Sequence, residues 1–175
     1  MNNKSYIDIE IDKLTNSIEN RSDGNVYDTE VIQLTVEDRH QIKKKDWRFD
    51  WHAELLNANR QVQKLVICNN VSIIQGLLSL EVKTDHVYLH LIESAFFNRG
   101  KDKIYVGVPG NLVAFACKIS FACGFTGYVA FDAKTALIPH YQETLKATHF
   151  KGTKMYIETP AALYLVKKYF NDINI

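Results

Sequence analysis

The middle of the chain, residues 91–132, places a glycine-containing loop between a strand pattern and a helix pattern. Residues 85–92 are rich in β-branched and aromatic side chains and predict a strand, and residues 128–132 predict a second one. Between them, the loop at 107–110 (Gly-Val-Pro-Gly) leads into an apolar helical pattern at 111–123. The backbone N–H groups of such a loop and the positive end of the helix favour a bound phosphate. This order of elements therefore predicts an α/β domain with a place for an anion.

Further strand and helix patterns surround this unit. In residues 5–11, Ile7, Ile9 and Ile11 alternate with polar residues, a period of two that is typical of a half-buried first strand or an extended arm. The other strands are expected at 30–35, 63–68, 71–82 and 155–158, and the other helices at 47–56, 135–146 and 160–170. This mixture predicts an α/β (α+β) fold with a mixed, largely antiparallel central sheet flanked by helices. We expect residues 1–175 to form a single domain, with residues 1–29 as an N-terminal strand and loop extension.

Composition excludes several classes of function. The formal net charge is +1 with both signs scattered along the chain, which argues against specific nucleic-acid binding. Neither an apolar run of about 18 residues nor an N-terminal signal segment is visible, so no membrane association is expected. Cys68, Cys117 and Cys123 lie in apolar stretches without a CxxC motif, which favours buried thiols in a reducing cytoplasm. His86 and His90 would lie about 13 Å apart on one strand, so no metal site is expected.

The segment after the second predicted strand adds a tyrosine to this order of elements. Residues 135–146 predict a short helix that carries Tyr141, followed by Ala-Thr-His-Phe at 147–150. This succession resembles the core of the GNAT N-acetyltransferases over roughly residues 6–170, and most specifically over residues 87–150. The resemblance implies a GNAT-like fold with a splayed strand pair at the cofactor site.

The resemblance also implies that acetyl-CoA is a co-substrate. In the family, the pantetheine pairs with backbone groups at the end of the splayed strand, and the glycine loop and its helix hold the pyrophosphate. Gly107 matches the family's first loop glycine, whereas Ile104 replaces an Arg or Gln and Pro109 replaces a second Gly or Ala. Lys101 or Lys103 could add positive charge beside this loop. The residues expected to bind the cofactor are Ile92, Glu93, Ser94, Val106, Gly107, Val108, Gly110, Asn111 and Lys134.

Two side chains are candidates for acetyl transfer to a primary amine by direct attack on the thioester. Tyr141 corresponds to the family's helix tyrosine, which would assist departure of the CoA thiolate. Glu93 lies at the strand end beside the expected thioester, where partial desolvation would raise its pKa and suit it to act as general base. Simpler interpretations are packing beneath the sheet for Tyr141 and a solvated strand-end charge for Glu93.

The sequence leaves the acceptor and the activity open. Trp47 and Trp51 are one helical turn apart, which indicates core packing more often than a substrate cage, while Asp50 or Glu54 could neutralise a cationic amine. The acceptor could be a small molecule or a protein, and a homodimer is compatible with the sequence. One alternative is a catalytically silent GNAT-like domain that binds acyl-CoA or a protein partner. A second is a nucleotide-binding protein, although the chain lacks GxGxxG and GxxxxGKS/T. The absence of GxSxG argues against a serine hydrolase.

Overall fold

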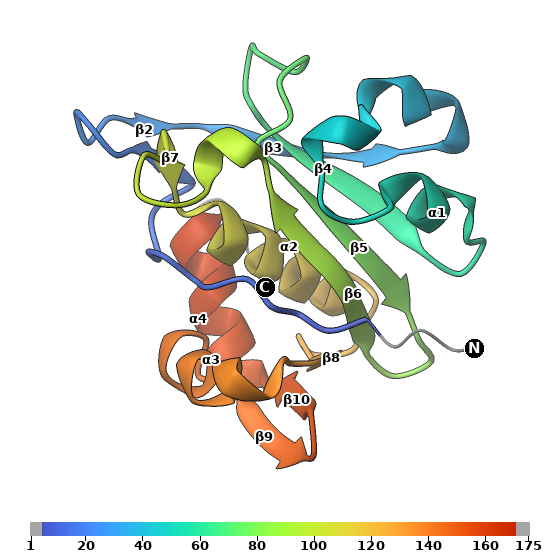
Figure 1. Ribbon diagram of the computed structural model, residues 1–175. Coiled ribbons are helices and arrows are strands. Elements are labelled where there is room, and N and C mark those ends of the chain that lie inside the picture. The colour runs from blue at the N-terminus through green and yellow to red at the C-terminus, as the bar shows by residue number, and fades with distance from the viewer. Residues whose placement is uncertain (1–4, 171–175) are drawn as a thin grey trace.

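A seven-stranded sheet forms the centre of the computed structural model, which describes residues 5–170 (Figure 1). All neighbouring strands in it are antiparallel except β6 and β8, which run parallel. In spatial order the strands are β3 (Thr29–Leu34), β4 (Gln61–Ile67), β5 (Gly76–Val82), β6 (Val87–Ser94), β8 (Val129–Asp132), β10 (Lys154–Ile157) and β9 (Thr148–Lys151). The mixed, largely antiparallel sheet predicted from the sequence is confirmed.

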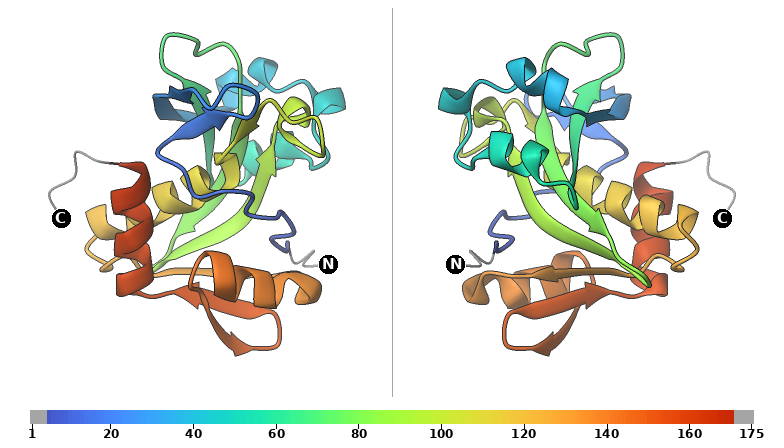
Figure 2. Two further views of the ribbon diagram at one scale, coloured as in Figure 1. Left: turned by 90° about the vertical axis from the view of Figure 1, so that its left-hand side faces the viewer. Right: turned by 90° about the vertical axis from the view of Figure 1, so that its right-hand side faces the viewer.

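Helices cover both faces of this sheet (Figure 2). On one face, α2 (Val108–Ala122) and α4 (Thr159–Tyr169) bury apolar side chains against Leu78, Leu80 and Leu89. On the other face, α1 (Trp51–Leu56) packs against Leu77 and Leu91. The remaining helical elements are α3 (Ile138–Thr144) and the 3₁₀ turns Val36–Gln41, Lys44–Asp46, Phe96–Asn98 and Thr135–Leu137.

A small second sheet ties the N-terminal part of the chain to the loop before α2. Its strands, in spatial order, are β2 (Val26–Tyr27), β1 (Ile18–Asn20) and β7 (Tyr105–Val106). In this sheet Val106 pairs with Glu19, so the strand before the glycine loop is held by residues far away in the sequence.

A β-bulge in β6 decides which side chains face which helices. Ser79 pairs with Leu91 and Leu80 pairs with Leu89, so His90 is an extra residue in β6. The extra residue reverses the alternation of faces, since Leu89 joins the core under α2 whereas Leu91 joins the core under α1. Glu93, two residues beyond Leu91, consequently points toward α1.

The parallel pair β6 and β8 stays together over three residue pairs, from Val87 with Val129 to Leu89 with Phe131. Beyond these pairs the two strands separate, and residues 6–14, which we call the N-terminal segment, lie in the gap (Figures 1 and 2). Ile7 forms a parallel bridge with Ala133, just past the end of β8. Ile7 and Ile11 are buried, as their alternation with polar residues predicts.

Several element boundaries differ from those expected. The helix expected at 47–56 begins only at Trp51, because Asp50 caps it by accepting the Ala53 N–H at 3.1 Å. The strand expected at 71–82 begins only at Gly76, since the preceding residues form turns. The short strands β1, β2, β7 and β9 were not expected. They have two to four residues each and bury few side chains, so they carry little periodic signal.

Candidate active site

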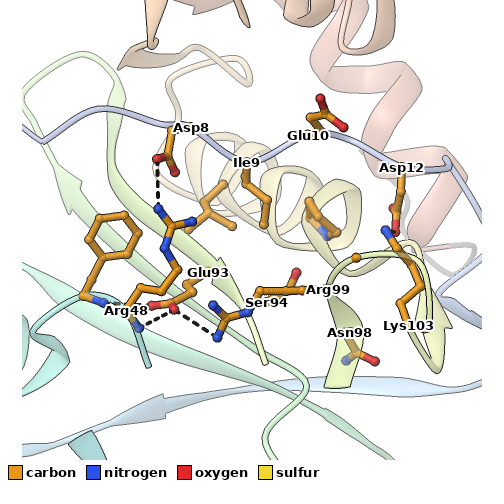
Figure 3. Close-up of a pocket in the computed structure, with 14 residues that line it drawn as sticks. Asp8, Ile9, Glu10, Asp12, Arg48, Glu93, Ser94, Asn98, Arg99 and Lys103 are labelled. Atoms are coloured by element: carbon orange, nitrogen blue, oxygen red, sulfur yellow. Dashed lines mark hydrogen bonds and ion pairs between the residues drawn. The ribbon is translucent and has the colours of Figure 1, made fainter. Parts of the chain in front are cut away.

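The gap between β6 and β8 contains a cavity of about 220 Å³ (Figure 3). The end of β6 forms one wall, the N-terminal segment forms the opposite wall, and Pro109 at the start of α2 lies at the cavity as well. Acidic and basic side chains meet around it in three ion pairs. The ion pairs are Arg48–Asp8 at 3.6 Å, Arg99–Glu93 at 3.3 Å and Lys103–Asp12 at 3.1 Å.

Glu93 is buried and its carboxylate is engaged on both oxygens. One oxygen accepts the backbone N–H of Arg48 at 2.6 Å, and the other accepts the indole N–H of Trp51 at 2.7 Å and the Phe49 N–H at 3.3 Å. Together with Arg99, these donors fix the start of α1 to the end of β6. The solvated strand-end charge considered for Glu93 does not match this environment. A general-base role stays a prediction, and the four donors weigh against it, because each one stabilises the charged carboxylate.

The backbone at the end of β6 is oriented toward the cavity. Ala95 donates its N–H to the Gln75 carbonyl, across the edge that β6 shares with β5. Because alternate residues of an antiparallel strand direct their N–H and C=O groups to opposite edges, we infer that those of Ile92 and Ser94 point away from β5. Both residues line the cavity, as expected for backbone groups that would pair with pantetheine.

The start of α2 binds a carboxylate of the chain itself. Gly107, in the left-handed region at φ +93°, donates its N–H to Asp12 Oδ1 at 3.0 Å, and Lys103 contacts Asp12 Oδ2. This is the anion contact predicted for a phosphate, made here by Asp12. A Cβ on Gly107 would lie 2.3 Å from the Thr15 hydroxyl oxygen, so only glycine lets the loop pack this closely against Thr15.

The rest of the expected phosphate loop faces inward. Val108, Gly110 and Asn111 are buried, and Asn111 donates its amide to Thr29 Oγ1 at 3.0 Å. Gly110 lies against the hydroxyl of Tyr169, where a Cβ would collide. These three residues are therefore covered by other parts of the chain, and Val106 is half-buried and pairs in the small sheet. Their predicted contact with a cofactor stays a prediction.

Tyr141 reaches the gap from the side of β8. Its ring packs edge-on against Phe131, and its hydroxyl donates to the Ile9 carbonyl at 2.6 Å. Burial raises the pKa of the Tyr141 phenol well above its ordinary value, so the hydroxyl stays protonated and available as a donor. Next to it, His140 Nε2 accepts the Ile11 N–H at 2.8 Å. The side chain of Lys134 is exposed, and its backbone N–H donates to the Ile7 carbonyl.

Tertiary structure thus brings Ile92, Glu93 and Ser94 to the same gap as Gly107 and Tyr141. Sequence reasoning missed Asp8, Asp12, Arg48 and Arg99, which supply most of the charge there. The acidic side of the alternating stretch at 5–11 was the available signal, but its partners lie far away in the sequence.

A second cavity of about 640 Å³ lies beside α1, between Asp50, Glu54 and the N-terminal segment. Glu54 is buried, accepting from Ser79 Oγ at 2.6 Å and pairing with Arg60 at 2.5 Å. Trp51 is 1% exposed and packs edge-on against Trp47, which supports the core interpretation for this pair.

Residues 5–170 contain neither a cluster of metal-ligating side chains nor a helix that could span a membrane. This part of the chain has no group of three or more His, Cys, Asp or Glu side chains placed to hold a metal ion. Its helices are all too short or too polar to cross a membrane.

Comparisons with known proteins bear on the fold. No family model matches the sequence, and no curated protein matches it. Among solved structures, a chimera of the spermidine N-acetyltransferase SpeG from Vibrio cholerae and hSSAT matches with a TM-score of 0.50 and 13% identity, over 78% of this chain and 98% of that one. AtaTR bound with AcCoA matches with a TM-score of 0.49 and 14% identity, over 79% of this chain and 98% of that one. The first match confirms the predicted GNAT-like fold, and at this identity it shows the fold alone.

Proposed function

We propose that this chain is an acetyl-CoA-dependent N-acetyltransferase that moves an acetyl group to a primary amine. One observation carries the proposal: β6 and β8 part at a point where the N-terminus of α2 and the hydroxyl of Tyr141 both face the gap. The gap therefore offers anion donors at one end and a protonated phenol at the other. A spermidine N-acetyltransferase is among the proteins that share this fold, which supports the reaction class by analogy only.

The cofactor would lie along the free edge of β6. Its pantetheine would pair with backbone groups of Ile92 and Ser94, as an added strand does. Its pyrophosphate would bind the Gly107 N–H with Lys103 and Arg99 nearby, since these cations already surround the cavity. Pro109 removes one N–H from the helix start, so the charge of these side chains replaces part of what a longer row of N–H groups would supply.

In the proposed reaction, the lone pair of a neutral amine attacks the thioester carbonyl carbon. The tetrahedral intermediate collapses by breaking the C–S bond, and the departing thiolate takes a proton from Tyr141. Tyr141 then regains a proton through cavity water, from the proton that the amine releases. The amine nitrogen loses its proton to a base, for which Glu93 is the candidate from the sequence. Because Glu93 is held by four donors, we favour water in the cavity as the immediate proton acceptor and Glu93 as a group that positions Arg48 and Trp51.

Thermal unfolding with added ligands tests the choice of cofactor. A ligand that binds only the folded protein raises the unfolding temperature, and at 100 times its Kd it adds about 2.7 kcal/mol. Acetyl-CoA and CoA should therefore raise the melting temperature, whereas ATP and NAD should leave it unchanged. Stabilisation by ATP or NAD without stabilisation by acetyl-CoA would falsify the proposed cofactor.

A catalytically silent acyl-CoA-binding domain is the second candidate. Ile104 and Pro109, which replace the Arg or Gln and the second Gly or Ala of the family's loop, favour it. An assay that follows CoA release over a broad panel of amines and peptides distinguishes the acetyltransferase from the silent domain. Acetyl-CoA binding with no turnover of any acceptor supports the silent domain.

A further inference from the structure

The N-terminal segment lies where the proposed cofactor would lie, and Figure 3 shows it crossing the cavity opposite Glu93 and Ser94. It forms hydrogen bonds with groups that belong to the proposed site. The Ile9 carbonyl accepts from the Tyr141 hydroxyl, and Asp12 accepts from the Gly107 N–H. In the proposed complex, the Tyr141 hydroxyl would face the thioester sulfur and the Gly107 N–H would face a phosphate, so a carbonyl oxygen and an anionic oxygen of the segment occupy these two positions.

The segment and an acyl-CoA would compete for these positions. Asp12 binds the donor at the start of α2 and pairs with Lys103, so a phosphate there would meet a carboxylate instead of a free N–H. Asp8 is paired with Arg48, and Glu10 also lines the cavity. While the segment is docked, each of the three cations at the cavity, Arg48, Arg99 and Lys103, is paired with an acid, so none of them is left unpaired for an incoming phosphate.

Two buried isoleucines and a small set of hydrogen bonds attach the segment. At Ile7 the segment bonds to backbone groups, donating to the Asp132 carbonyl and accepting the Lys134 N–H. At Ile9, Ile11 and Asp12 the hydrogen bonds involve a side chain. On the side of β6 the cavity of about 220 Å³ separates it from the strand. A stretch with few backbone bonds and an open side has low local stability and opens more readily than the strands around it.

We propose that residues 6–14 act as an internal competitor that holds the acyl-CoA site closed until an acyl-CoA displaces them. The inference rests on the proposed function, because the site it closes is the one proposed for acetyl-CoA. Only the form with the segment released binds acetyl-CoA. When the docked form predominates, the apparent Kd for acetyl-CoA is therefore higher than the intrinsic Kd by about the ratio of docked to released protein. Weakening the docked form therefore tightens cofactor binding without any change in the binding groups.

Two matched substitutions in the full chain test this competition. Asp12→Ala removes the contacts with Gly107 and Lys103. Glu10→Ala removes the same charge from the same segment at an exposed position that has no hydrogen bond or ion pair within residues 5–170. The Kd of acetyl-CoA is measured for both by isothermal titration calorimetry, with circular dichroism to show that each variant is folded. Asp12→Ala should tighten binding by about tenfold, as loss of a hydrogen bond to a charged group implies, and Glu10→Ala by less than about twofold.

Amide hydrogen exchange reports directly on whether acetyl-CoA displaces the N-terminal segment. The amides of Ile7 and Ile11 are bonded to Asp132 and His140, and saturating acetyl-CoA should make both exchange faster. The competition is overturned if acetyl-CoA binds the wild type while these amides stay protected, or if both substitutions change the Kd equally; either result leaves the proposed function intact. Absence of acetyl-CoA binding in the folded wild type and in both folded variants refutes the proposed function, and the competition with it.

Discussion

Tyr141 and Glu93 are both buried near the same gap, yet their hydrogen bonds differ in how readily they could be exchanged for one to a substrate. The Tyr141 hydroxyl makes one bond, to the Ile9 carbonyl, and keeps its proton because burial raises its pKa. The Glu93 carboxylate receives three N–H donors and an arginine. A single bond can be exchanged for one to a substrate, whereas a fully bonded carboxylate serves to fix its neighbours.

Replacing Tyr141 separates catalysis from binding. Tyr141→Phe should lower kcat by about 10²–10⁴-fold if the phenol protonates the thiolate. It should also leave KM for acetyl-CoA unchanged or lower, because the bond that holds Ile9 in the gap is lost as well. Steady-state kinetics with an accepted amine measures both. Equal kcat for the folded variant and the wild type, with chemistry rate-limiting, reduces Tyr141 to a packing residue.

Glu93→Gln distinguishes a base from a positioning group. The neutral amide cannot pair with Arg99 and presents donors to the donors of Arg48 and Trp51, so the free energy of unfolding should fall by about 3 kcal/mol. A positioning role predicts the same relative loss of kcat at every pH. A base predicts the largest loss at low pH, where the amine most needs deprotonating. Urea unfolding and a pH–rate profile give the two readouts.

His90 links stability to pH. Burial lowers its pKa below the ordinary value of 6.5, against the opposing effect of Glu81 at 2.8 Å. The unfolded chain therefore binds a proton more readily than the folded protein, so stability is full above the unfolded value and is lost as pH falls through 6.5 and below. His90→Gln should flatten this decline. Urea titrations from about pH 7.5 to about 5.5 measure it, and identical slopes for both proteins would remove His90 as the cause.

At the scale of elements, close contact between α2 and β5 sets where the helix begins. Gly76 pairs with Ser94 in regular register, and the bulge of this strand pair lies farther along β6, at His90. Gly76 is needed because a Cβ there would lie 2.7 Å from Val108 Cγ1. The first turn of α2 can therefore reach the end of β6, where the proposed cofactor site lies.

This contact predicts that a smaller side chain at position 108 offsets the loss of stability caused by a larger one at position 76. Gly76→Ala should lower the free energy of unfolding by about 1–3 kcal/mol, because the added methyl group overpacks the contact with Val108. In a Val108→Ala background, the same substitution should cost less, since the colliding methyl group is gone. Chemical denaturation of the four proteins gives the coupling energy, and additive effects would show that the two sites do not contact each other.

At the scale of the whole molecule, the N-terminal segment joins two halves of the sheet that otherwise share three residue pairs of β6 and β8. Ile7 and Ile11 carry this role, because both are buried in the core that α2, α3 and α4 also share. The same segment thus contributes to stability and fills the proposed cofactor site. Release of the segment must cost stability, which acyl-CoA binding would offset.

Ile11→Ala measures this contribution. Truncation of a buried isoleucine should lower the free energy of unfolding by about 2–4 kcal/mol. Ile104→Ala is the matched control, since Ile104 is 45% exposed and its loss should change stability by less than about 0.5 kcal/mol. Urea unfolding compares the two. Similar small effects would mean that the segment does not hold the halves of the sheet together.

The sequence by itself determined the order of the main elements and the class of the fold. Periodicity is a local property, so it placed α2, α4 and the long strands, and it assigned Ile7 and Ile11 to a buried face. The family resemblance added Gly107 and Tyr141 as candidates for one cofactor site, which stays a prediction. These predictions needed only neighbours within a few positions and a known order of elements.

Tertiary structure alone decided what fills the gap and how the site is charged. Tyr141 and Ile9 are 132 positions apart, Gly107 and Asp12 are 95 apart, and Glu93 and Arg48 are 45 apart. No local pattern encodes such partners, because they depend on the bulge at His90 and on the path of the N-terminal segment between two strands. A buried carboxylate such as that of Glu93 must be paired with donors, because burying an unpaired charge costs too much free energy.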